Sequence, residues 1–214
     1  KKQLLDLQNN IGNHGRYGTG EMSTASRIWA GMGRGDVLLV CLIGQLKCLD
    51  AKDEHCWYYD NGCKAPYANR LTSREGVNAI SAQRLGNAAA GLQMGLMQCS
   101  GGAPAVPGVI RIFPAYPEDI GDAAFFSLRA RGAFLVSAEM RNGKPAYAIV
   151  RSLRGNDCRF MNVFGKKISV RDLETGEKID FTESDGDIIF KTEAEHEYAV
   201  ENSDKPLEAF EMRS

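Results

Sequence analysis

"GVIRIFPAYPEDIGDAAFFSLRARGAFLVSAEMRNGK", residues 108–144, is the stretch that decides the fold. It begins as an apolar run typical of a buried strand and is interrupted by Pro114 and Pro117. Proline cannot donate a hydrogen bond to a β-ladder, so the first strand is expected to end there. The stretch closes with Asn142-Gly143 between two apolar runs. Such a pair predicts a two-residue hairpin, because a type I′ turn needs positive φ at both positions.

Outward from this stretch, toward the C-terminus, short β-rich segments alternate with turn residues. The expected strands are 108–113, 124–130, 133–140, 145–152, 158–164, 167–173, 178–182, 187–191 and 197–201. Short strands at regular spacing favour an antiparallel sandwich. We therefore expect residues 105–214 to form a C-terminal β-sandwich domain.

Toward the N-terminus the pattern is helical instead. Residues 23–50 have apolar positions three and four apart, with a glycine-rich break near 31–35, which predicts a helical hairpin. A long polar and aromatic loop is expected over 51–75, and a helix rich in small residues over 86–100. A small group of apolar helices normally needs further helices to cover it. Residues 1–104 are therefore interpreted as the last helices of a larger (α/α) barrel. The fold class is therefore α+β.

Composition narrows the choice of partners and of cofactors. The chain has 214 residues, 43% hydrophobic and 25% charged, with a net charge of −1, so we expect neither nucleic acid nor a membrane as partner. The run "VLLVCLIG" is too short to cross a bilayer. Cys41 and Cys48 fall in a helical pattern and are expected to be buried thiols, whereas Cys56 and Cys63 could pair. Their spacing does not fit a zinc site, so no metal or cofactor is expected.

A search for catalytic residues selects no constellation. Of the three histidines, His14 lies in a glycine-rich segment, His55 stands beside a cysteine, and His196 is expected on the surface within "EAEHEY". Glycoside hydrolysis needs two carboxyl groups across the scissile bond. Spacing alone selects no pair among the candidate acids Glu21, Asp36, Asp53, Glu54, Asp60 and Glu75.

Several segments together resemble one known family. These are "QRLGNAAA" at 83–90, "LMQCS" at 96–100, "IFPAYP" at 112–117 and "LRARGAF" at 128–134. They resemble the end of the α-L-fucosidase-like glycoside hydrolases, which have a six-hairpin helical barrel and a terminal β-sandwich. The likeness is strongest over roughly 83–160, and "EMSTASRIWAGMGRGDVLLVCLIGQL" is similar to the preceding barrel helices. The combination is specific, although no single motif is.

The resemblance implies an inverting mechanism, with an acid supplied by an upstream barrel segment. The base of the family is the Asp of a Gln-Ile-Asp-Gly-Asn segment. Gln83, Gly86 and Asn87 match that segment, but Leu85 occupies the Asp position, and leucine cannot take a proton from water. Three readings remain open: an altered relative without the base, chemistry through another carboxylate, or a local shift that brings Glu75 into play.

The function expected from the resemblance is therefore the C-terminal portion of a hydrolase acting on α-L-fucosyl or related glycans. No residue of this chain is assigned a catalytic role. The candidates for substrate binding are Gln83, Asn87 and Trp57. The alternative is a non-catalytic carbohydrate-binding or assembly fragment, with a companion chain completing the barrel. No signal peptide is visible, so the periplasmic or extracellular location that the resemblance implies would require a processed or truncated start.

The stretch 108–144 is interpreted as the junction between barrel and sandwich. Within it, Ile110, Ile112 and Phe113 are expected to be core residues. Arg129 and Arg131 are expected to pair with carboxylates of the helical part.

Overall fold

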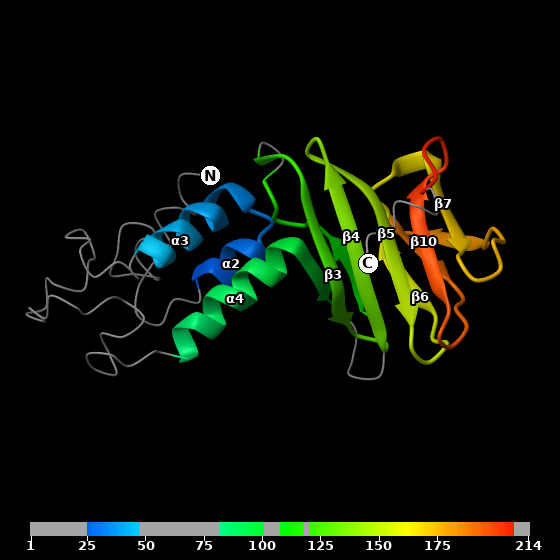
Figure 1. The fold of residues 1–214 in the computed structure, drawn as a ribbon, viewed down its shortest axis with the longest axis horizontal. Coiled ribbons are helices and arrows are strands. Elements are labelled where there is room, and N and C mark those ends of the chain that lie inside the picture. Colours follow the sequence, from blue (N-terminus) through cyan, green and yellow to red (C-terminus); the bar gives the residue numbers. More distant parts are fainter. Residues whose placement is uncertain (1–24, 48–81, 101–107, 118–119, 208–214) are drawn as a thin grey trace, which may run out of the picture. The chain divides into compact units, whose positions relative to one another are not determined.

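The computed structural model describes residues 25–47, 82–100, 108–117 and 120–207. These residues form two compact units (Figure 1). The helical unit contains the described helices up to Gly95, together with residues 114–117. The β unit contains the strands from Met97 onward. The stretch 108–144 therefore contributes to both units, because residues 114–117 belong with the helices and the remainder belongs with the strands.

The helical hairpin predicted over 23–50 is confirmed over its described part. Helix α2 spans Ala25–Gly31 and helix α3 spans Gly35–Lys47. The chain turns between them at Gly33, whose φ is 69°, a value that glycine adopts without the steric cost of a side chain. The helices bury a small apolar cluster made of Trp29, Ala30, Val37, Leu38, Cys41 and Ala115. The expectation that Cys41 is buried is confirmed, while Cys48 lies outside the described residues.

Helix α4, Ala82–Leu96, packs closely through its small residues, as its sequence predicts. A Cβ atom added at Gly91 would lie 2.5 Å from the side chain of Ser26 on α2, and one added at Gly95 would lie 2.6 Å from Leu38 on α3. Such distances leave no room for a side chain, because packed protein interiors contain few voids. None of the described helices is long and apolar enough to cross a membrane.

The boundary of α4 corrects one expectation. Helix was predicted over 86–100, but residues Met97–Ser100 form strand β1, which pairs antiparallel with β2, Val109–Ile112. Pairing with a strand that follows in the sequence overrides the local helical pattern there. Strand β2 ends before Pro114, as expected.

The β unit contains two five-stranded sheets, consistent with a β-sandwich. Sheet A has the order β1-β2-β6-β9-β8. Sheet B has the order β3-β4-β5-β10-β7, and its strands are labelled in Figure 1. The remaining bounds are β3 Ala123–Ala130, β4 Phe134–Arg141, β5 Lys144–Ser152, β6 Cys158–Met161, β7 Ile168–Asp172, β8 Phe181–Ser184, β9 Asp187–Phe190 and β10 Glu197–Asn202.

The two sheets pack against each other through the buried side chains that alternate along their strands. Along β4, every second residue is buried, from Phe134 to Met140, as a half-buried strand requires. The ring of Phe190 on sheet A lies 5.7 Å from the ring of Tyr198 on sheet B, in a tilted arrangement. The two sheets therefore share one aromatic and aliphatic core.

Three details differ from the sequence expectation for the sandwich. The pair β2–β6 is parallel, so sheet A is mixed rather than purely antiparallel. The strand expected over 158–164 ends at Met161, and the short 3₁₀-helix η3, Gly165–Lys167, precedes β7. The strand expected over 178–182 begins at Phe181, while Lys178 makes only an isolated bridge to Arg171.

The hairpin at the end of the opening stretch is confirmed. Asn142 and Gly143 connect β4 to β5 with φ values of 52° and 72°. These are the positive angles of a type I′ turn. The backbone N–H of Asn142 donates to Asp122 Oδ1 at 2.7 Å, which fixes the turn against the start of β3.

The core residues expected in the stretch are also confirmed, since Ile110, Ile112 and Phe113 are all buried. Phe113 packs its ring 5.4 Å from that of Phe125 on β3. Arg129 and Arg131 are both exposed in the β unit. Most acids of the helical part lie outside the described residues, so their expected ion pairs stay a prediction.

Candidate functional site

The sugar-binding candidates from the sequence are only partly described. Asn87 lies half-buried on α4, and its backbone carbonyl accepts a hydrogen bond from the buried Ser26 hydroxyl at 3.3 Å. Gln83 and Leu85 belong to the same helix, but the positions of their side chains are outside the described part. Trp57 lies outside the described residues. The structure therefore places Asn87 beside α2 and does not test these residues as a group.

The other candidates fall into two classes. His14, His55, Cys56, Cys63 and five of the six acids considered above lie outside the described residues. Asp36, the remaining acid, is exposed near the start of α3 and is bound in a two-point contact by Arg34, with N···O distances of 2.8 and 2.6 Å. A carboxylate held in this way is a surface ion pair, which contributes little to stability.

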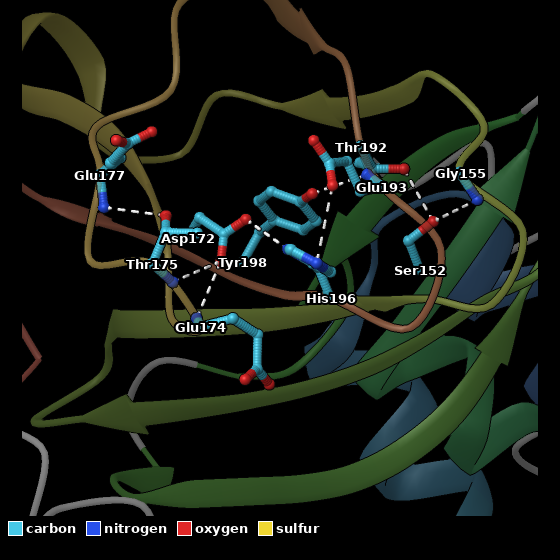
Figure 2. A network of polar contacts seen from close by, with 10 residues as sticks. All are labelled: Ser152, Gly155, Asp172, Glu174, Thr175, Glu177, Thr192, Glu193, His196 and Tyr198. Atoms are coloured by element: carbon cyan, nitrogen blue, oxygen red, sulfur yellow. Dashed lines mark hydrogen bonds and ion pairs between the residues drawn. The ribbon is translucent and has the colours of Figure 1, made fainter.

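The polar groups that the described residues do bring together lie where the chain passes between the two sheets. Residues 153–157 lead from β5 in sheet B to β6 in sheet A, and residues 191–196 lead from β9 in sheet A back to β10 in sheet B. We call these two segments the crossovers. Figure 2 shows Ser152 at the end of β5 between Gly155 of the first crossover and Thr192 of the second.

Buried hydroxyl groups join the crossovers. Thr192 Oγ1 lies 2.7 Å from Ser152 Oγ and 2.6 Å from the carbonyl oxygen of Asn156, and the Gly155 N–H donates to Ser152 Oγ at 3.0 Å. A carbonyl can only accept, so Thr192 donates to Asn156, and Ser152 donates to Thr192. Each hydroxyl proton is thus already used. Ser152, which is fully buried, is consequently a structural residue and is not placed as a nucleophile.

Backbone contacts reinforce the same junction. The Glu195 N–H donates to the carbonyl of Ser152, and the Ser152 N–H donates to the carbonyl of His196 at 3.0 Å. Gly155 has a φ of 71°, and a Cβ atom there would lie 3.2 Å from the backbone nitrogen of Ala194. Glycine is therefore favoured at this position both for its backbone angle and for the close approach of the second crossover.

His196 lies at the outer end of the network. Its Nδ1 is 2.7 Å from Asp172 Oδ2, and its Nε2 is 3.6 Å from Glu193 Oε2 (Figure 2). The imidazole also stacks at 6.4 Å on the ring of Tyr198, whose hydroxyl accepts the N–H of Glu193 at 2.7 Å. His196 lies at the surface as expected, with 26% of its side chain exposed, but the sequence did not indicate that it contacts the buried carboxylate of Asp172 at the end of β7.

Asp172 organises the turn that follows β7. Its Oδ1 accepts the backbone N–H groups of Glu174 and Thr175 at 2.8 and 3.2 Å, and the Thr175 hydroxyl accepts the N–H of Glu177. An aspartate that satisfies its own turn in this way is a common device in tight turns. The sequence "DLETGE" carried this signal, but it did not indicate that the other carboxylate oxygen would bind a histidine.

The contacts shift the pKa values of the pair in opposite directions. Burial disfavours the charged form of Asp172, but the hydrogen bonds from His196, Glu174 and Thr175 outweigh it, so the pKa of Asp172 is lowered. The hydrogen bond with Asp172 raises the pKa of His196; burial opposes this shift, and the charges of Asp172, Glu193 and Glu174 add to it. The pair is thus an imidazolium–carboxylate contact that favours its charged form.

This arrangement can hold a proton but is not open to a sugar. A pair of catalytic carboxyl groups must face each other across the bond to be cleaved. Here the imidazole of His196 occupies the space between Asp172 and Glu193. The network therefore fits a role in holding the sandwich together.

The β unit is similar to a domain of a known protein family. Residues 106–200 match the family model described as glycoside hydrolase family 95, C-terminal domain. The match supports the interpretation of the β unit as the C-terminal domain of a glycoside hydrolase. It covers the strands from β2 to most of β10, and hence the whole crossover network. No curated protein matches the chain.

Proposed function

We propose that the chain is the C-terminal portion of a glycoside hydrolase that acts on α-L-fucosyl or related glycans. The match of residues 106–200 to the C-terminal domain of a glycoside hydrolase family carries this proposal. The fucosyl preference rests on the resemblance of residues 83–160 to α-L-fucosidase-like enzymes. On this account the helical unit is the end of an (α/α) barrel, and the location is periplasmic or extracellular.

In this proposal the β-sandwich is a supporting domain, and the chemistry belongs to the barrel. The polar groups of the crossover network are paired with one another. Gln83, Asn87 and Trp57 would contribute binding contacts, with amide groups for sugar hydroxyls and an indole face for the ring. The acid and base would come from carboxylates of the barrel segments.

A second function is favoured by one observation, the leucine at position 85 where the related enzymes have their base. Without that carboxylate the chain would bind glycans, or complete a barrel together with a companion chain, and would not cleave them. Glu75 and the upstream acids remain the alternatives for a relocated base.

Site variants test the proposal. Asn87→Ala and Gln83→Ala should each lower kcat/KM for an aryl α-L-fucoside by about tenfold to a hundredfold, because each removes hydrogen bonds to substrate. The control is Lys167→Ala, which removes an exposed contact with Asp204 in the β unit and should leave kcat/KM unchanged. The measurement uses the complete gene product. Full activity in both amide variants would contradict the assignment of the binding residues.

A further inference from the structure

The second crossover carries an acid-rich cluster around one histidine. His196 is faced by Asp172 at the end of β7, by Glu174 in the turn after it, and by Glu193 on its own segment. Tyr198 contributes its ring and hydroxyl from β10. Nearby, Arg151 on β5 holds Glu195 at 2.8 Å and also faces Glu174 and Glu197. When its ring is doubly protonated, His196 supplies the positive charge that binds Asp172.

The two contacts of His196 are both attractive only when the ring carries two protons. An imidazolium donates from both nitrogens, whereas a neutral imidazole donates from one and presents a lone pair at the other. With Nδ1 at 2.7 Å from the nearly buried Asp172, the neutral form keeps its proton there. Its Nε2 lone pair then faces the carboxylate of Glu193, and an attractive contact becomes a repulsive one.

We propose that His196 is a proton-operated latch of the second crossover, residues 191–196, closed when the ring is doubly protonated and loosened when it is neutral. The latch acts on a segment whose tip is exposed at Glu193, Ala194 and Glu195. There the N–H groups of Glu193 and Glu195 donate to the Tyr198 hydroxyl and the Ser152 carbonyl, and these bonds report whether the segment is closed. Its inner end stays fixed, because Thr192 and Ser152 carry no group that titrates near neutral pH. The opening is therefore local and leaves the sheets paired.

The sign of the effect follows from proton linkage. A group whose pKa is higher in the closed state stabilises that state fully at low pH, and the stabilisation is lost as the pH rises through the raised pKa. The crossover should thus be most protected in mildly acidic solution and should open more often toward alkaline pH. The cluster of Asp172, Glu174 and Glu193 adds to this trend, because deprotonation of His196 leaves three like charges together.

Amide hydrogen exchange followed by NMR tests the latch on the folded chain. Between about pH 5 and about pH 8, the range in which histidine titrates, the protection factors of Glu193, Glu195 and His196, corrected for intrinsic exchange, should fall several-fold. Those of Ala148 and Val150 in the middle of β5 should stay constant as an internal reference. In His196→Gln, which keeps a hydrogen-bond donor but does not titrate, the protection factors of the crossover should be independent of pH.

The control variant is Lys167→Gln, which removes another charged contact of the β unit and should retain the wild-type pH dependence. Crossover protection that does not change with pH in the wild type, or that changes equally in His196→Gln, would overturn the latch. Should that variant fail to fold, the ring protons of His196 are titrated in the wild type. A midpoint above that of a free histidine supports the latch, and a midpoint at or below it overturns the proposal.

Discussion

Phe113 is held in an uncommon conformation by its burial. Its φ is 50°, a value that bulky residues rarely adopt, yet its ring is almost wholly covered and packs against Phe125. Phe113→Ala should lower the free energy of unfolding by about 3–5 kcal/mol, because a large buried ring is lost and the backbone angle stays the same. Urea unfolding measures the change. Phe126→Ala is the matched control, since that ring is 59% exposed and its loss should cost less than about 0.5 kcal/mol. A similar small cost for both variants would contradict the core assignment.

The carboxylate of Asp172 is expected to stabilise the fold by an amount that changes with pH. Its carboxylate accepts charge-assisted bonds from His196 and from two backbone amides, so Asp172→Asn should destabilise the protein by about 1–3 kcal/mol near neutral pH. Because its pKa is lowered on folding, this contribution is complete above its ordinary value of 3.8 and is lost as the pH falls through the folded value. The stability difference between wild type and variant should therefore shrink in strong acid.

Thermal unfolding at several pH values measures that difference. Asp180→Asn, at an exposed position, is the control and should show no such change with pH. A difference between wild type and Asp172→Asn that stays constant into strong acid would mean that the carboxylate is not the group that holds the turn.

At the scale of elements, helix α4 depends on glycine where it meets α2. Gly91→Val should destabilise the helical unit by several kcal/mol, because its Cβ would overlap Ser26. Gly86 lies on the same helix with nothing within 4 Å of an added Cβ, so Gly86→Ala should stabilise by about 0.5–1 kcal/mol through better helix propensity. Thermal unfolding followed by circular dichroism measures the change in stability of each variant. Equal effects of the two substitutions would mean that α4 does not pack on α2 as described.

Local signals predicted most of the strands but not all of their partners. Asn142-Gly143 set its hairpin correctly, because turn chemistry acts within four residues. Strand β1 was missed, since Met97–Ser100 has no turn signal before it and becomes a strand only by pairing with Val109–Ile112. The parallel pairing of β2 with β6 joins Ile110 to Phe160, and no local pattern reports a contact so distant in the sequence.

The candidate sites show the same division. The apolar run at 108–113 placed Phe113 in the core. No pattern showed that Asp172 meets Glu193 and His196, because Asp172 ends β7 and the other two lie in the second crossover. His196 therefore looked like one charge among many in "EAEHEY". The prediction for Asn87 came from a resemblance to known enzymes, and the structure adds that this residue lies half-buried beside Ser26.

At the scale of the whole molecule, we propose that this chain is the C-terminal part of a glycan-cleaving enzyme. Its sandwich matches a glycoside hydrolase C-terminal domain, while the acid and base are proposed to lie in the barrel. Activity should therefore accompany any preparation in which the barrel is complete.

The most direct measurement is the intact mass and partner content of the native protein, with hydrolysis of an aryl α-L-fucoside and an aryl α-L-galactoside followed in the same sample. We predict a longer chain or a companion chain, together with release of sugar. A native protein of this chain alone, folded and inactive on both substrates, would contradict the account and would favour a binding role consistent with Leu85.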